Sequence, residues 1–144
     1  MIKVEQNEKK STLTVDFTNK LFMEESKWLE NEIEKYATEK VIVVTHHAPL
    51  IKGVSDPVYE NASGNSRLLN SAFASDMTSV FKSNVLAWFF GHTHYSSKQK
   101  YQGTLIASNQ LGYLAISDGN TGFEENWIFD TLNYDLSKVK EFEP

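Results

Sequence analysis

The spacing of apolar residues changes along the chain, and each spacing predicts one kind of element. Between Thr18 and Thr38, apolar positions recur every three or four residues and the positions between them are mostly charged. This pattern gives one apolar face and predicts an amphipathic helix, with Thr18 or Asn19 as its N-terminal cap. The predicted apolar face consists of Phe22, Leu29, Ile33 and Tyr36.

Two short apolar runs show no alternation. Residues 41–45 and 85–90 are continuous and rich in β-branched or aromatic residues, which is typical of strands buried on both faces of a layered α/β sheet. Between these runs, a second helical spacing predicts a helix that begins at Asn70 or Ser71 and completes a right-handed βαβ unit. Its apolar positions are Phe73, Met77, Val80 and Phe81.

The remaining segments carry weaker signals. Residues 98–101 and 104–107 flank Gln102-Gly103, which predicts a hairpin with a tight turn. The aromatic tail from Phe123 onward has the composition of a further edge strand. The connection from residue 46 to about residue 70 is far longer than the usual loop of about 4–6 residues, so we expect it to be functional or disordered.

Composition excludes several classes of protein. With 40% apolar residues and 144 residues in all, the chain can bury a core and fold as a globular protein. The net charge is −5 and Arg67 is the single arginine, so strong nucleic-acid binding by a cationic surface is not expected. No apolar run approaches the roughly 18 residues that span a bilayer. Because the start of the chain also lacks a signal-peptide core, we expect a cytoplasmic protein.

All four histidines lie in two short clusters, each directly after a predicted strand. His46 and His47 follow the first strand, and His92 and His94 follow the second, preceded by Gly91. The carboxyl ends of neighbouring strands in an α/β sheet face a common crevice, which predicts that the two clusters converge.

Neutral imidazoles are common ligands of zinc, iron and manganese, so convergence of the clusters predicts a metal site. The chain has no cysteine, so imidazole and oxygen must supply the ligands of any such site. We expect Gly91 to let the backbone bend sharply and approach the ions.

These segments resemble motifs of a known superfamily. THHAP at residues 45–49 and GHTH at residues 91–94 are similar to the fourth and fifth motifs of calcineurin-like metallophosphoesterases, which include purple acid phosphatases and many phosphodiesterases. SDPVYE, SAFASD and SNQLGY, beginning at Ser55, Ser71 and Ser108, extend the resemblance over Leu13 to Leu114. It implies an α/β fold, with residues 1–144 forming the C-terminal half of a four-layer α/β/β/α metallophosphoesterase sandwich.

The resemblance also implies roles for individual residues. His46 and His92 resemble ligands of one metal, and His94 a ligand of a second, which implies two divalent ions of manganese, iron or zinc and a phosphoester substrate. His47 resembles a second-shell or substrate-facing neighbour. Arg67 can hold a substrate phosphate through two parallel hydrogen bonds, or it can be an ordinary solvated arginine.

The chain departs from the superfamily in its first forty residues. The Asp-x-His, Gly-Asp-x-x-Asp and Asn-His-Glu or Asn-His-Asp motifs that precede THHAP in the family are absent. We therefore expect a partial phosphoesterase domain that needs a missing N-terminal half and is inactive alone.

Two other readings stay open. One is a different histidine-ligated metallohydrolase, although Tyr95-Ser96 follow His94 where a metallo-β-lactamase has HxHxDH. The other is a non-catalytic half-domain that scaffolds or pairs with a separate chain.

Overall fold

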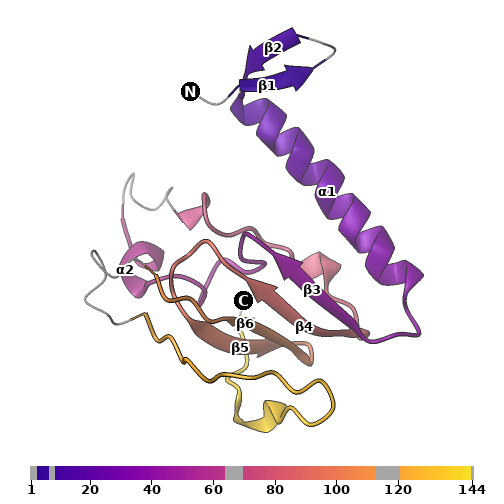
Figure 1. The fold of residues 1–144 in the computed structure, drawn as a ribbon, viewed down its shortest axis with the longest axis vertical. Helices are drawn as coiled ribbons and strands as arrows, with labels where there is room; N and C mark the ends of the chain where they lie inside the picture. The colour runs from indigo at the N-terminus through magenta and orange to yellow at the C-terminus, as the bar shows by residue number, and fades with distance from the viewer. Residues whose placement is uncertain (1–2, 7–8, 64–69, 113–120, 144) are drawn as a thin grey trace. The chain divides into compact units, whose positions relative to one another are not determined.

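The structure is a computed structural model that describes residues 3–6, 9–63, 70–112 and 121–143. The chain divides into two compact units, Met1–Lys35 and Tyr36–Pro144 (Figure 1). None of the described helices combines the length and the apolar character that crossing a membrane requires.

The first unit is a β-hairpin followed by a long helix (Figure 1). Strands β1 (Lys3–Gln6) and β2 (Lys9–Thr12) pair antiparallel, and α1 spans Val15–Lys35. The hairpin was not predicted because its two strands contain a single apolar residue, Val4, which is too few for a strand pattern.

Helix α1 confirms the predicted amphipathic helix but begins and ends three residues earlier. The predicted caps Thr18 and Asn19 are wrong, because Thr14 precedes the helix and its Oγ1 accepts a hydrogen bond from Phe17 N at 3.2 Å. A side-chain acceptor three residues before a free amide satisfies one of the unpaired donors of the first turn. Thr18 lies inside the helix and donates its hydroxyl to the Thr14 carbonyl.

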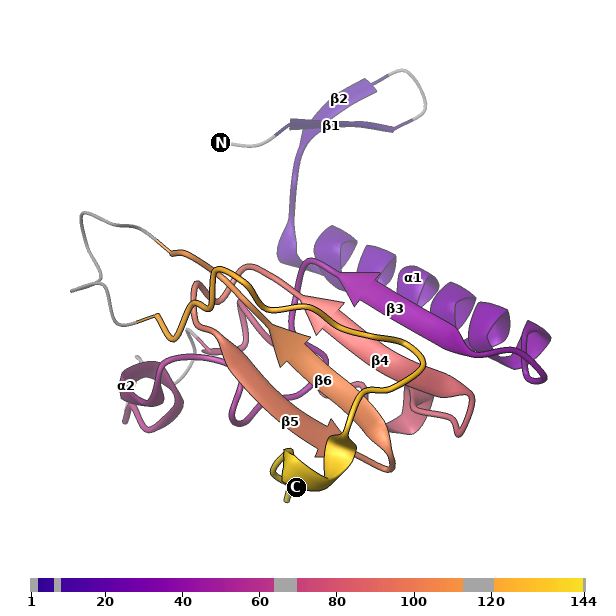
Figure 2. The ribbon, with the colours of Figure 1, turned by 60° about the horizontal axis from the view of Figure 1, so that its bottom comes forward.

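The second unit is built on a mixed four-stranded sheet in the order β3-β4-β6-β5 (Figure 2). Strands β3, β4 and β6 are parallel, and β5 pairs antiparallel with β6. These strands are β3 (Val41–Thr45), β4 (Val85–Phe90), β5 (Ser97–Tyr101) and β6 (Thr104–Ser108); a short helix α2 (Pro57–Glu60) follows β3. The predicted α/β class and both predicted parallel strands are therefore confirmed.

The predicted hairpin is also confirmed. Tyr101 on β5 pairs with Thr104 on β6, so that Gln102 and Gly103 form the two-residue turn. Both turn residues have positive φ, 51° and 82°, as a type I′ turn requires.

The predicted helix between β3 and β4 is wrong. Residues 71–81 contain turns and one 3-10 turn, Thr78–Val80. Local backbone bonds are confined to single turns, such as Ala74 N to Asn70 O at 3.1 Å, and the middle of the segment pairs with another part of the chain. Ala48 N donates to Phe73 O, and Ser75 N donates to Ala48 O, both at 3.0 Å. The apolar spacing still directs burial, since the buried residues here are Ala74, Met77, Val80 and Phe81.

The core lies on both faces of this sheet. On one face Trp88 of β4 is 1% exposed and stacks on Phe81, with ring centroids 4.9 Å apart. On the other face Ala87, Leu105 and Ala107 are fully buried. The side chains packed on that second face are Phe89, Trp127, Phe129, Tyr134, Leu136 and Val139.

The tail crosses the sheet face and forms no strand within residues 121–143. Trp127 and Phe129 meet Phe89 edge to face, with centroids 5.9 and 5.2 Å apart. The described part of the tail pairs with β5 through one isolated parallel bridge, between Glu141 and Lys100. The predicted edge strand is therefore wrong, because the aromatic residues cover the sheet instead of extending it.

Strand β3 is buried on one face only, whereas burial on both faces was predicted. Val43 is 4% exposed, but Ile42 and Val44 on the opposite face are 42% and 74% exposed. Strand β4 has the predicted character, with every residue buried or half-buried. The difference arises because the tail packs over β4 and β6, whereas β3 is the last strand of the sheet.

Candidate metal centre

The two histidine clusters meet because β3 and β4 are adjacent and parallel. Thr45 at the end of β3 lies opposite Phe90 at the end of β4. Gly91 N then donates to His46 O at 3.1 Å, which continues the pairing one residue past both strands. The ends of β3 and β4 lie side by side in Figure 2, so the predicted convergence of His46 and His92 is confirmed.

Three imidazoles form a compact triangle at this edge of the sheet. The ring centroid of His92 lies 4.6 Å from that of His46 and 4.7 Å from that of His47. The His46 and His47 rings are 5.3 Å apart and nearly perpendicular. His47, expected to be a neighbour of the ligands, is thus as close to His92 as His46 is.

Burial and nearby positive charge lower the pKa of two of these rings, His47 and His92, and favour their neutral form. Partial burial lowers the pKa of His47 below its usual value, and the positive charge of His46 lowers it further. The pKa of His92 is lowered first by burial and then by His47, His46 and His94, against a hydrogen bond to the backbone of Ala72 that raises it. A neutral ring keeps the nitrogen lone pair that a metal ligand needs.

The backbone is unusual at both histidines of the second cluster. His92 and His94 have φ of 67° and 50°, and among the described residues they share positive φ with one other non-glycine residue, Gln102. Gly91 does not have positive φ, and a Cβ placed on it would meet its nearest neighbour at 3.8 Å, an ordinary contact, so the left-handed backbone lies at the two histidines and not at the glycine. Non-glycine residues in the left-handed region are uncommon and concentrate at functional sites, where the surrounding structure holds them.

Each turn is held by a side chain that the sequence did not single out for this role. Thr45 Oγ1 accepts from the indole of buried Trp88 at 2.9 Å and donates to His47 O at 2.7 Å. Gln110, after β6, accepts a hydrogen bond from His94 N at 3.0 Å. Gln110 belongs to the SNQLGY segment of the resemblance, which was the available signal.

The long connection after His47 is ordered in its described part. The Glu60 carboxylate accepts hydrogen bonds from the backbone amides of Gly53, Val54 and Ser55 at 2.8–2.9 Å. Asn70, predicted as a helix cap, instead donates its side-chain amide to the Ile51 carbonyl at 2.9 Å. Residues 48–63 are ordered, so the disordered alternative is wrong for this part of the connection, and a function for it stays a prediction.

The end of this connection reaches the histidines. The Phe73 ring lies 5.1 Å from the His92 ring, and the backbone of neighbouring Ala72 bonds to His92. Metal-ligating histidines usually donate their second ring nitrogen to a carbonyl or carboxylate, and Ala72 offers that kind of partner. Arg67, the candidate phosphate-binding residue, lies outside the described residues.

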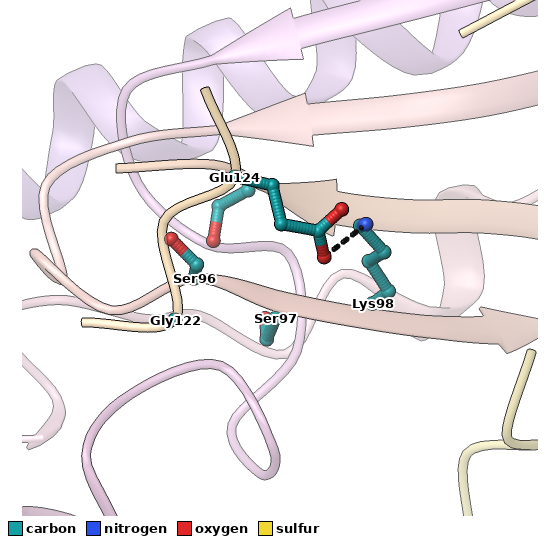
Figure 3. A pocket seen from close by; sticks show the side chains of 6 residues that line it. Ser96, Ser97, Lys98, Gly122 and Glu124 are labelled. Atoms are coloured by element: carbon teal, nitrogen blue, oxygen red, sulfur yellow. Dashed lines mark hydrogen bonds and ion pairs between the residues drawn. The ribbon is translucent and has the colours of Figure 1, made fainter. Parts of the chain in front are cut away.

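A separate hollow of about 240 Å³ lies beside β5 (Figure 3). Its main charged groups are already paired, since Lys98 Nζ lies 2.7 Å from Glu124 Oε1. The hydroxyls of Ser96 and Ser108 also have backbone partners. The hollow is lined by Ser96, Ser97, Lys98, Ser108, Gly122 and Glu124.

The centroids of the three histidine rings are spaced as those of imidazole ligands of one metal would be, but this spacing alone does not make a metal site. Two imidazoles that bind one ion at about 2.0–2.1 Å through nitrogen, at a tetrahedral angle, have centroids roughly 5 Å apart. The three measured separations, 4.6, 4.7 and 5.3 Å, bracket that value. Among the described residues, no group of three or more histidine or carboxylate side chains is arranged to hold an ion as it stands.

Comparison with known proteins finds one uncharacterized relative. Over 119 residues, 78% of this chain, the sequence is 39% identical to "Uncharacterized protein L509" of Acanthamoeba polyphaga mimivirus. The matched region is 40% of that protein, so the chain spans less than half the length of this relative. No protein-family model and no solved structure matches the chain.

Proposed function

We propose that this chain supplies the histidine half of a dinuclear metal site in a calcineurin-like metallophosphoesterase. The observation that carries the proposal is the meeting of His46, His47 and His92 where two parallel strands end, with ring centroids 4.6–5.3 Å apart. In α/β folds this end of the sheet is where ligands bind. The resemblance of THHAP and GHTH to the family motifs indicates the type of reaction, which is metal-dependent hydrolysis of a phosphoester.

Each histidine has a defined task in this proposal. His46 and His92 donate neutral nitrogens toward one ion, and His94 donates toward a second, so the ions keep net positive charge for the phosphoryl oxygens. His47 lies against His92 and faces the substrate or supports that ligand. Divalent ions held by these residues would supply the chemistry, which is a bound water of lowered pKa that can attack phosphorus.

The carboxylate half of the site must come from additional polypeptide. Residues 1–40 lack the family's Asp-x-His, Gly-Asp-x-x-Asp and Asn-His motifs. The mimivirus relative has room for such a segment, because the matched region makes up 40% of its length. We propose that the sheet is the C-terminal half of a four-layer α/β/β/α sandwich. In that arrangement another strand lies along β3, next to the exposed Ile42 and Val44.

Hydrolysis of bis(p-nitrophenyl) phosphate tests the proposal. The isolated chain should be nearly inert, because losing one preorganised electrostatic partner typically costs about 10²–10³ in rate and several are missing here. A restored protein, in which a segment with the three missing motifs precedes this chain, should hydrolyse the substrate with manganese, iron or zinc. His46→Ala, His92→Ala and His94→Ala should each abolish most of this activity, with a milder effect of His47→Ala.

Gln102→Ala is the matched control, because Gln102 lies in the β5–β6 turn at the opposite end of β6 from the histidines. It should leave hydrolysis unchanged. The proposal fails if the restored protein is inactive with all three metals on several phosphoester classes, or if the three histidine variants match the parent. Activity restricted to amide or lactam substrates would support a different histidine-ligated metallohydrolase instead.

A second candidate function is a non-catalytic half-domain that pairs with another chain. It is favoured by the exposure of Ile42 and Val44, at 42% and 74%, on an end strand whose sequence is typical of a sheet interior. Under this reading Val44→Lys should weaken pairing, whereas Val58→Lys, at a similarly exposed valine in α2, should not. Pairing measured by analytical ultracentrifugation, together with a restored protein that never hydrolyses phosphoesters, would favour the second function over the first.

A further inference from the structure

The turn that carries His92 and His94 needs support from outside its own sequence. Both residues have φ in the left-handed region, which non-glycine residues hold only when surrounding contacts determine it. Within the turn, Thr93 N donates to Gly91 O at 2.8 Å. The Thr93 hydroxyl also donates to Tyr95 O at 3.4 Å. Neither of these two bonds involves an atom of His94.

The support comes from Gln110, which lies sixteen residues after His94. Gln110 Oε1 accepts from His94 N at 3.0 Å. Its Nε2 donates to Thr93 Oγ1 at 3.0 Å and to Tyr95 O at 3.1 Å. One side chain therefore contacts three consecutive residues of the histidine turn.

An amide is the side chain that matches these three partners. The turn presents one donor, His94 N, and two oxygens that accept. Glutamine offers an acceptor oxygen and two N–H donors on one planar group, whereas a carboxylate offers acceptors alone and methionine offers neither. Among glutamine, glutamate and methionine, glutamine alone can accept from His94 N and also donate to Tyr95 O.

Gln110 is itself held firmly. Its backbone N donates to Ser96 Oγ at 2.8 Å, and Ser96 Oγ donates to Gln110 O at 3.2 Å. On the other side, Asn109 Nδ2 donates to Glu124 O and Asn109 Oδ1 accepts from Glu124 N, at 2.8 and 2.9 Å. Asn109 thus anchors the same segment to a different part of the chain.

We propose that Gln110 is a positioning residue that sets the ligand-presenting conformation of the His92–His94 turn. This inference rests on the proposed metal site, and it assigns the site a residue that lies outside both histidine motifs. Gln110 acts on His94 and its neighbours, whereas His46 and His47 are held by Thr45 and Trp88. Loss of Gln110 should therefore disturb one cluster and spare the other.

The test compares Gln110→Met, Gln110→Glu and Asn109→Ala in the full chain. Zinc binding is measured by calorimetry at pH 7.5, and backbone, imidazole and indole resonances of the metal-free chain by NMR. Gln110→Met should weaken zinc binding about 10–100-fold, as loss of a partner that orients a ligand does. It should shift the resonances of residues 92–95 and leave in place that of the Trp88 indole N–H, which bonds to Thr45 beside the other cluster. Gln110→Glu keeps the acceptor for His94 N, so its zinc affinity should fall between those of the parent and of Gln110→Met.

Asn109→Ala is the matched control because it loosens the same segment without removing a contact to the turn. Its affinity for zinc should stay within about twofold of the parent's, even if the substitution lowers the melting temperature. The inference is overturned if Gln110→Met binds zinc with the parent's affinity. It is also overturned if Asn109→Ala loses as much zinc affinity as Gln110→Met does. A parent chain that binds no zinc contradicts the metal site itself. In that case the metal-free resonances still decide whether Gln110 holds the turn.

Discussion

The indole of Trp88 donates a hydrogen bond to Thr45 Oγ1 across the two parallel strands, at 2.9 Å. Trp88 is 1% exposed, and the same threonine hydroxyl donates to His47 O at 2.7 Å. These two hydrogen bonds connect the core of the sheet to the backbone of the first histidine turn. The position of His46 and His47 is thereby tied to the packing of β3 against β4.

A double-mutant cycle on this pair should show strong coupling. Thr45→Val leaves the buried indole N–H and the His47 carbonyl without this partner, which should cost about 1–3 kcal/mol of unfolding free energy. Trp88→Phe removes the donor and part of the ring, within the usual ~0.5–3 kcal/mol of a core substitution. The double variant should lose at least ~0.5 kcal/mol less unfolding free energy than the two single variants lose in sum, because the two residues share one bond. Urea denaturation measures all four proteins; additive losses would contradict the relationship.

Stability should fall as the pH drops below neutrality. His47 and His92 have pKa values lowered in the folded chain, mainly by burial. The unfolded chain therefore binds more protons as pH falls through about 6.5, and the equilibrium shifts toward it until the lower folded pKa values are passed. The parent should lose more stability between pH 7.5 and 5.5 than a His47→Gln, His92→Gln variant, measured by urea midpoints. Equal losses would show that the two rings are not responsible.

The isolated chain should bind at most one zinc ion, weakly. It offers imidazoles, while the carboxylate motifs of the family are absent. Protonation competes with the metal for each ring, so binding should disappear below about pH 6. His46→Ala and His92→Ala should each remove it in calorimetry, whereas Gln102→Ala should not. Two tight sites in this chain alone would be inconsistent with a half-site.

The loop between β3 and the second histidine turn should depend on Glu60. Its carboxylate accepts three backbone hydrogen bonds, from Gly53, Val54 and Ser55. Glu60→Gln replaces charged acceptors with an amide and should cost about 1–3 kcal/mol, with faster hydrogen exchange at those three amides. Glu124→Gln makes the same change in an exposed pair with Lys98, where under about 1 kcal/mol is expected. Equal effects of the two substitutions would contradict the assigned role of Glu60.

The meeting of the histidine clusters was predictable because it follows from sheet geometry. Two continuous apolar runs indicate parallel strands, and the residues after such strands share an edge. The hairpin at Gln102-Gly103 was predictable for a similar reason, because the turn chemistry is local. What holds the histidines was not predictable: Trp88 reads as an ordinary core residue, and Gln110 lies sixteen residues from the turn that it contacts.

The failures share one physical cause, which is tertiary competition for local groups. Residues 71–81 have helical apolar spacing, but their backbone bonds to Ala48 and its neighbours. The aromatic tail has strand-like composition, but Trp127 and Phe129 pack edge to face on Phe89, so the tail covers the sheet instead of extending it. Positive φ at His92 likewise cannot be predicted from residue type, because histidine adopts that conformation only where neighbours hold it.

X-ray absorption spectroscopy of the restored, zinc-loaded protein tests the central claim most directly. The account predicts imidazole scattering together with a metal–metal vector of about 3.5–4 Å. That vector should vanish in His46→Ala, His92→Ala and His94→Ala and persist in Gln102→Ala. A fully loaded protein without a metal–metal vector, or a vector that survives all three histidine substitutions, would contradict the assignment of these residues to a dinuclear site.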